Sequence, residues 1–457
     1  MFNVGAASVC ITPPIGGLLS GYAARKDVSI GVHDDLFARC LVVGDGHTEV
    51  AIITCDLIGL DKEIVAEVRE RVTKQTGLPT SNLMICCTHT HSGPDGLRKG
   101  ITGFDASLRE ITIRKLASLV NLARSQCEPC KMKIGFMDVH TLSQNRRDPD
   151  WGILPRLTVL IAENESGDIK AILINFACHG TVLGSKNLYI SADYPGAVVG
   201  VIQAVMGENV TVLFTNGACA DINPARRTPS FKEIERFGLV LGGEVLRLAG
   251  DLLALGDRVA ADNIRWGEAI EKKIDAGHLI KDGKLWVGSR HVQLKLKEPL
   301  SSDEDYKHKL QELRKELEAL KACGASLDKI REQMAKITAL EAESYFAPRV
   351  RNLRESGEEY LSCELQVIGF DDETAIIGLP GEIAHDIGKE LINHGGFSYL
   401  TICGYSNDYA GYIVTDRTYL EGGYEAGATP FAPGTEDAFV KAALDLLGDC
   451  RKREGNG

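Results

Sequence analysis

The chain has 457 residues, of which 44% are apolar, 25% charged and 6% aromatic. This composition supplies a large buried core and excludes disordered, collagen-like and small disulfide-rich proteins. Lys and Arg total 51 against 63 Asp and Glu, so the formal net charge is −12 and no basic run stands out. These numbers argue against nucleic acid or stable membrane association, and they favour a small molecule or another protein as the partner.

Short runs rich in Val and Ile alternate with amphipathic stretches along the chain. The runs predict buried strands at 51–60, 82–87, 156–162, 171–178, 210–217, 362–369, 374–379 and 398–403. The stretches predict helices at 61–76, 105–125, 194–206, 231–254 and 434–448. We therefore expect an α/β layered fold in which helices flank a largely buried, mixed or partly parallel sheet. Because no linker or internal repeat divides the chain, residues 1–457 are expected to form a single domain.

Residues 303–345 differ in kind from the rest of the chain. They are rich in Lys and Glu, and their Leu, Ile and Met residues recur three and four apart on both sides of Gly324. This pattern predicts an inserted antiparallel helical hairpin. Two interpretations stay open. The hairpin is either a solvated arm or subunit contact, which would make the protein a homo-oligomer, or a lid that shapes the choice of substrate.

The cysteines and the N-terminus bear on the cellular compartment. Thirteen cysteines are spread along the chain, several within apolar runs, as expected for free thiols in a reducing compartment. The first residues lack a secretory leader pattern, and no stretch of eighteen apolar residues follows. We therefore expect a soluble, cytoplasmic protein. The Cys127–Cys130 pair precedes a strand rather than a helix, so we expect no redox or metal role for it.

The strongest local motif is Thr-His-Thr-His-Ser-Gly-Pro at 88–94, directly after an apolar strand. Residues two apart in an extended segment face the same side, so the imidazoles of His89 and His91 are expected to project together. His179 also ends an apolar strand. Two strand-end histidine sites favour a shared metal over hydrogen-bonded loop histidines, since ligand sites in α/β sheets gather at strand ends. Asp193, at an expected helix start, is interpreted as a helix cap.

Three later segments add polar side chains. The loop Asn-Gly-Ala-Cys-Ala-Asp-Ile-Asn-Pro at 216–224 follows a buried strand, as a site-lining loop or an ordinary turn would. Glu382 follows the strand at 374–379 and is expected in the first turn of a helix, as a dipole partner, a general base or a ligand. Five of the twelve tyrosines lie between Tyr405 and Tyr424. Buried phenols beside a cation can bind it or stabilise an oxyanion.

Taken together and in order, these segments resemble the catalytic domain of the neutral, non-lysosomal ceramidases, which are zinc-dependent amide hydrolases. The resemblance extends over most of the chain. It rests on the segments 6–13, 21–23, 88–94, 145–146, 177–181, 191–196, 216–224 and 380–382 and on the tyrosine-rich end. It implies one Zn²⁺ per chain, held by His89, His179, Glu382 and Tyr412.

The resemblance also implies roles around that metal. His91 would assist proton transfer or hold the substrate, Arg146 would bind the substrate, and Tyr424 would stabilise the oxyanion. Asp221 and Asn223 are expected to contact the substrate. Asn223 stands where the family has a catalytic serine, and we expect its amide, or Arg146, to help Tyr424 stabilise the oxyanion. The family also carries a C-terminal β-sandwich domain, which we do not expect here because the chain ends soon after the tyrosines.

The sequence therefore predicts a zinc-dependent hydrolase that uses metal-activated water on a small soluble amide, or on a related ester or lactone. Metal activation of water removes the need for a protein nucleophile, so loss of the family serine is compatible with activity. Two alternatives stay open. One is an amidohydrolase-type barrel with eight βα units. The other is a non-catalytic metal-binding or scaffolding protein, for which Asn223 is the main argument.

Overall fold

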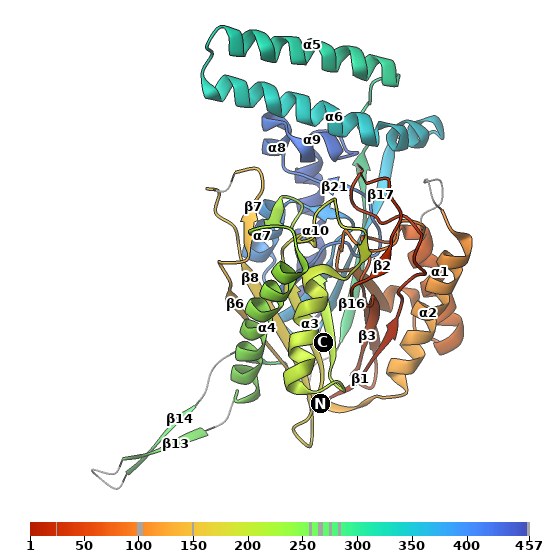
Figure 1. The fold of residues 1–457 in the computed structure, drawn as a ribbon. Helices are drawn as coiled ribbons and strands as arrows, with labels where there is room; N and C mark the ends of the chain where they lie inside the picture. The colour runs from red at the N-terminus through yellow and green to blue at the C-terminus, as the bar shows by residue number, and fades with distance from the viewer. Residues whose placement is uncertain are drawn as a thin grey trace.

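A computed structural model describes residues 1–23, 25–97, 104–148, 150–255, 258–263, 268–273, 277–281 and 285–454. Two stacked β-sheets lie at its centre (Figure 1). Within the described ranges, no helix has both the length and the apolar character needed to cross a membrane.

The larger sheet has nine strands in the order β11-β9-β8-β6-β1-β3-β4-β5, with β15 beside β6. Its inner pairs are antiparallel, whereas β4–β5 and β9–β11 at the two ends are parallel. The strands are β1 (Phe2–Cys10), β3 (Phe37–Gly44), β4 (Glu49–Cys55), β5 (Leu83–Cys87), β6 (Glu128–Asp138), β8 (Arg156–Asn164), β9 (Ile169–Phe176), β11 (Thr211–Asn216) and β15 (His278–Leu279).

The smaller sheet has the order β16-β17-β18-β20, in which only β18–β20 is parallel. Its strands are β16 (Trp286–Lys295), β17 (Tyr360–Gly369), β18 (Thr374–Gly378) and β20 (Tyr399–Cys403). Four two-stranded pairs complete the β-structure. They are β2 (Gly31–Val32) with β10 (Tyr189–Ile190), β7 (Ser143–Asn145) with β12 (Ile222–Pro224), β13 (Arg258–Asn263) with β14 (Glu268–Lys273), and β19 (Glu382–Ile383) with β21 (Tyr412–Ile413).

The helices cover the outer faces of the two sheets and one end of the molecule (Figure 1). They are α1 (Lys62–Thr76), the 3₁₀ turn η1 (Thr80–Asn82), α2 (Ala106–Arg124), α3 (Asp193–Met206), α4 (Phe231–Leu253), α5 (Asp303–Ala322), α6 (Leu327–Glu355), α7 (His385–His394), α8 (Asp416–Glu421), α9 (Tyr424–Ala428) and α10 (Thr435–Glu454).

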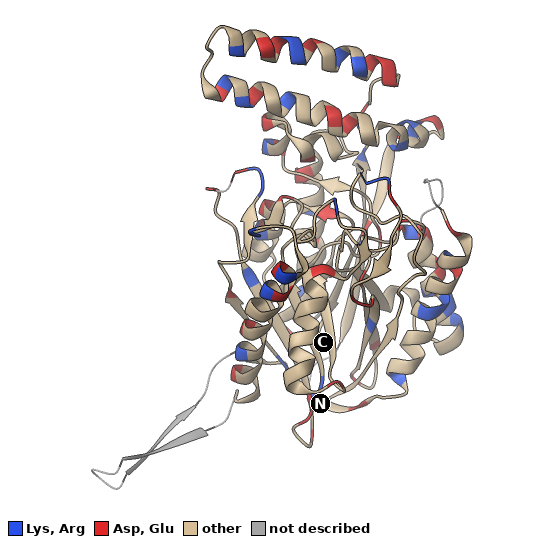
Figure 2. Ribbon diagram, in the orientation of Figure 1, with Lys and Arg blue, Asp and Glu red and all other residues tan. Residues whose placement is uncertain are grey.

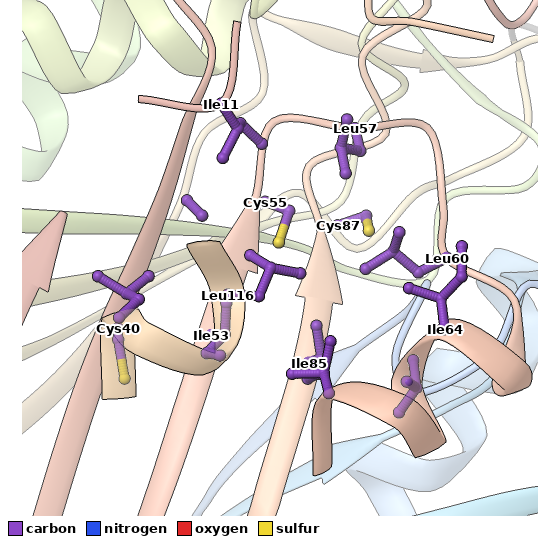
Figure 3. Close-up of a cluster of buried hydrophobic side chains, with 14 of the residues drawn as sticks. Ile11, Cys40, Ile53, Cys55, Leu57, Leu60, Ile64, Ile85, Cys87 and Leu116 are labelled. Atoms are coloured by element: carbon purple, nitrogen blue, oxygen red, sulfur yellow. The ribbon is translucent and has the colours of Figure 1, made fainter. Parts of the chain in front are cut away.

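Four buried clusters show how the layers pack. Alternate strand residues point to opposite faces, so each sheet contributes to clusters on both of its faces. One face of the larger sheet packs on α1 and α2 at one end and on α3 and α4 at the other. Figure 3 shows the first of these clusters, in which Cys55 and Cys87 end β4 and β5. The opposite face packs on the smaller sheet, which α7 and α10 cover in turn. The predicted α/β layered fold is confirmed, and these open, stacked sheets exclude the eight-unit barrel for the described residues.

Helices α5 and α6 form the predicted antiparallel hairpin, which projects from one end of the molecule (Figure 1). Acidic and basic side chains alternate along both helices, as Figure 2 shows. Leu310 and Leu313 of the predicted α5 seam pack with Leu340 and Ala347 of α6, which lie beyond the α6 positions that the sequence singled out. Helix α6 continues to Glu355, beyond the predicted limit at residue 345.

Lys297 lies at the base of the hairpin with little exposure to solvent. Its Nζ donates to the carbonyl oxygen of Gly427 at 2.6 Å and lies 3.8 Å from a carboxylate oxygen of Glu343. Burial, opposed by the charge of Glu343, lowers the pKa of Lys297 to about 8. The base of the hairpin therefore contains an ammonium group whose charge costs stability at neutral pH.

We expect the stability of the protein to depend on this lysine in alkaline solution. The folded state releases the Lys297 proton at a lower pH than the unfolded chain does. Stability should therefore rise between about pH 8 and pH 10.5, by about 3 kcal/mol relative to Lys297→Met. Urea denaturation of the wild type and of Lys297→Met at several pH values measures this difference in stability. The contributions of the other titrating groups are the same in both proteins and cancel. A difference that stays constant across the range would contradict the prediction.

Candidate metal centre

The two strand-end histidines come from opposite halves of the larger sheet. His89 follows β5 and His179 follows β9, and the side chain of Asn216 joins the two segments. Its Nδ2 donates to the carbonyl oxygens of Thr88 at 3.2 Å and Cys178 at 2.9 Å, and its Oδ1 accepts from the Cys178 N–H at 3.1 Å. Asn216 is fully buried. One amide therefore brings together the residues that precede both histidines.

Asn216→Ala is expected to lower the free energy of unfolding by about 2–4 kcal/mol, because it leaves buried backbone groups without partners. Asn82→Ala is the matched control, since that amide is partly exposed, donates one bond to the Glu49 carbonyl oxygen and accepts one from the exposed Ser81 hydroxyl. Its cost should stay below about 1 kcal/mol. Urea denaturation compares the two variants, and equal losses would remove the special role given to Asn216.

Strained backbone surrounds the site. Among the described residues, the non-glycine residues with left-handed backbone are His89, Asp193, Tyr405 and Asn407, with φ between 52° and 62°. Such residues persist where surrounding structure enforces them, and they cluster at functional sites. The segment at His89 is therefore not extended as predicted. The imidazoles of His89 and His91 converge because of this bend rather than through strand alternation.

The side chains of His89, His91 and His179 form one group that could hold a metal ion. The Nε2 atoms of His89 and His91 lie 3.1 Å apart. The Oε2 atom of Glu382 lies 3.1 Å from His179 Nε2 and 3.6 Å from His89 Nε2. Three imidazole nitrogens and one carboxylate oxygen therefore face a common point.

The outer nitrogens of two of these histidines are held by the backbone. The Nδ1 atom of His89 lies 2.7 Å from the Ile58 carbonyl oxygen, and that of His179 lies 2.7 Å from the Cys219 carbonyl oxygen. Each Nδ1 must donate, which leaves the Nε2 lone pairs directed at the cluster. This is the tautomer that a metal ligand requires, so the donor set fits Zn²⁺, which favours nitrogen and carboxylate oxygen.

The electrostatics of the site also favour a cation. Burial lowers the pKa of His89 to about 4 against the opposing charge of Glu382, and burial with His89 holds the pKa of His91 well below its usual range. Burial alone would raise the pKa of Glu382, but His89 and His179 outweigh it and lower that pKa to about 2. At neutral pH these groups present neutral imidazoles and an ionised carboxylate.

Glu382 reaches the histidines from the other half of the chain. It lies on β19 rather than in the first turn of a helix, because α7 begins only at His385. The hydroxyl of Tyr409 makes a short hydrogen bond to Glu382 Oε1, and the ring of Tyr405 stacks on His89 with centroids 4.0 Å apart. The tyrosine-rich stretch was the only sequence signal for these two contacts.

A second group of predicted residues adjoins Glu382. In the β19–β21 pair, Glu382 is the register partner of Tyr412, whose hydroxyl lies 3.4 Å from Arg146 Nη2. Arg146 Nε donates to Glu425 Oε1 at 2.6 Å, and the guanidinium lies 5.4 Å from the ring centroid of Tyr424. Glu425, which no sequence pattern indicated, also binds Arg147 at 2.8 Å. Arg146, Tyr412 and Tyr424 therefore form one cluster beside the metal-binding group.

Asp221 and Asn223 occupy the loop and strand that support His179. Asp221 Oδ1 accepts from the His385 N–H at 2.8 Å, and Oδ2 accepts from the Asn145 amide at 3.0 Å. Both oxygens of Asp221 have protein partners, so its carboxylate positions β7 and α7. Asn223 lies half-buried on β12. Contact of either residue with substrate stays a prediction.

Asp193 supports the loop after His179. Although it is the first residue of α3, its carboxylate accepts from the N–H groups of Val182 and Leu183, both at 3.1 Å, as well as from its neighbour Tyr194. The predicted helix cap is therefore wrong, because the N-cap position of α3 is Ala192 and has no side-chain cap; the Asp193 carboxylate instead supports the segment that carries His179.

Comparison with known proteins points to one family. Residues 2–225 match the family described as neutral/alkaline non-lysosomal ceramidase, N-terminal. Over 99% of the chain, the sequence is 21% identical to a neutral ceramidase from Pseudomonas aeruginosa and covers 72% of that protein. The first half of the chain therefore matches the neutral/alkaline ceramidase family, and its full length is similar to one neutral ceramidase.

Other members of the family match shorter segments. A neutral ceramidase from Mycobacterium tuberculosis is 26% identical over 43% of the chain, which covers 35% of that relative. The crystal structure of the Pseudomonas aeruginosa neutral ceramidase superposes with a TM-score of 0.73 at 17% identity, covering 99% of this chain and 75% of that one. This likeness shows that the ceramidase fold extends beyond the matched first half, to Glu382 and the tyrosines.

Proposed function

We propose that this protein is a zinc-dependent hydrolase that cleaves an amide, or a related ester or lactone, of a small molecule. The observation that carries the proposal is the convergence of three imidazole nitrogens and a buried carboxylate oxygen on one point. The curated relatives are named neutral ceramidases, which supports amide hydrolysis. The residues that would hold one Zn²⁺ are His89, His179, Glu382 and Tyr412, with His91 beside them.

When bound, zinc supplies Lewis-acid activation of water and of the scissile carbonyl. The protein supplies the remaining groups. His91 is neutral at physiological pH, so its imidazole can take a proton and pass it to the leaving group. Arg146 and Tyr424 offer N–H and O–H donors to the oxyanion, and neither function needs a serine. This proposal is compatible with asparagine at position 223.

The free cysteines and the hairpin bear on the cellular compartment and on the partners of the protein. All thirteen cysteines are free thiols in the structure, which supports a reducing compartment such as the cytoplasm. We propose a small soluble substrate rather than a membrane lipid. A homo-oligomer built through the hairpin stays a prediction that sedimentation would test.

Elemental analysis of the purified protein, followed by a substrate panel, tests the proposal. We expect about one zinc per chain, absent from a His89→Ala, His179→Ala variant. The panel should contain N-acyl amides, esters and lactones of graded chain length, with ceramide as one member. Zinc binding without turnover of any class would favour the scaffolding alternative. If no metal is bound after purification with zinc supplied, the proposed hydrolase function would be overturned.

A further inference from the structure

One face of α6 lies against the tyrosine-bearing segment 405–428. The face consists of Ala335, Ala339, Ala342, Phe346 and Arg349, which recur at alternate steps of four and three and therefore share one side of the helix. Figure 1 shows α6 lying directly over α8 and α9. Helix α5 lies beyond α6, on the far side of this contact.

The contact between α6 and α9 is close because both sides carry small residues. The N–H of Gly423 donates to the Ala335 carbonyl oxygen at 3.0 Å. A Cβ at Gly427 would overlap the Ala339 carbonyl oxygen and lie 2.9 Å from the Ala342 side chain. Only glycine at position 427 allows the two backbones to approach this closely. Such a contact fixes the distance of α9 from the hairpin.

The same face of α6 reaches the residues behind the metal-binding group. Ala342 shares a buried cluster with Ala220, Tyr412 and Ala428, and Phe346 packs against that cluster. One turn further on, Arg349 Nη2 donates to the Tyr409 carbonyl oxygen at 3.2 Å. The lysine at the hairpin base, Lys297, holds the last turn of α9 through Gly427.

The segment 405–428, which α6 supports on one side, faces the candidate site on its other side. Tyr409 binds Glu382, Tyr412 lies beside Arg146, and Glu425 pairs with Arg146. In the described chain, these side chains have α6 behind them and the metal-binding residues in front. Dense packing transmits small displacements, so a shift of α6 moves these groups.

We propose that α6 is a positioning element of the active site and that Ala342 is a positioning residue which fixes Tyr412 and α9 relative to the metal-binding histidines. The proposal rests on the proposed function for its catalytic consequence. It assigns the hairpin a role within its own chain. Neither a solvated arm nor a subunit contact explains this role, because the inner face of α6 packs against the segment that supports the site.

The test compares Ala342→Leu with Ala319→Leu. The second variant makes the same substitution on α5, where Ala319 is exposed. We expect Ala342→Leu to weaken zinc binding about 10–100-fold, as loss of an outer support commonly does. Competition with a chelator measures this affinity without any substrate. Hydrogen exchange should rise in residues 409–428 and stay unchanged in α1, whereas Ala319→Leu should match the wild type in both measurements.

Unchanged zinc affinity and unchanged exchange in Ala342→Leu would overturn the proposal. If the wild-type protein binds no zinc, the proposed function fails, and hydrogen exchange alone then decides whether α6 positions the segment. If Ala342→Leu does not fold, Phe346→Ala and Phe346→Leu replace it. Loosening of 409–428 by alanine and its rescue by leucine support the proposal, while equal behaviour of the two variants opposes it.

Discussion

Replacing Glu382 with glutamine is expected to strip zinc from the protein and to lower kcat at least about 10³-fold. Glu382 supplies the negative charge nearest to His89 and His179, and it is 2% exposed. Glutamine keeps the shape but removes this charge, so His89, His179 and Tyr412 would have to hold a dication without the carboxylate. A bound metal contributes several kcal/mol of charge stabilisation in such reactions, and its loss sets the expected size of the effect.

The matched control is Glu364→Gln on β17. That carboxylate also pairs with a cation, Arg69 at 2.7 Å, but it belongs to the smaller sheet and not to the metal-binding group. Elemental analysis and a hydrolysis assay on both variants give the result. A Glu382→Gln protein that retains one zinc per chain would remove Glu382 from the ligand set, and equal loss in Glu364→Gln would indicate a general effect on folding.

The second large effect is expected for Tyr424→Phe, which should lower kcat about 10²–10³-fold with zinc retained. That range is the usual cost of removing one oxyanion donor, about 3–4 kcal/mol. Partial burial, followed by the charge of Glu382, raises the pKa of Tyr424 to about 12. The hydroxyl therefore keeps its proton at neutral pH and can donate it in a hydrogen bond. Its loss should affect kcat more than KM, since the oxyanion forms only in the transition state.

Tyr345→Phe on α6 is the control for this substitution, because that tyrosine is 58% exposed and lies outside the cluster around Arg146. Steady-state kinetics on any substrate from the panel separate the two variants. A near wild-type rate for Tyr424→Phe would assign the oxyanion to other donors, such as Arg146. A joint loss of zinc and rate would instead place Tyr424 in metal binding.

The sequence alone predicted the layered α/β fold, because the period of the apolar residues reports burial directly. The helices expected at 61–76, 105–125, 194–206 and 231–254 differ from the observed ones by only one residue at any end. The strands that precede His89 and His179 were predicted from runs of Val, Ile and Leu. The hairpin was predicted because its two seams have helical spacing and turn at a glycine. These are local patterns, which a chain carries without its tertiary contacts.

The tertiary structure decided how these elements meet. The bend at His89, the amide of Asn216 and the short β19–β21 pair bring His89 and Glu382 together although 293 positions separate them in the chain. No local pattern encodes such contacts. The sequence placed Glu382 on a helix because a two-residue strand has no periodicity to detect. The roles of Tyr409, Glu425 and the inner face of α6 were also missed. Their importance comes from what they touch, and the contacts exist only after the two sheets have packed together.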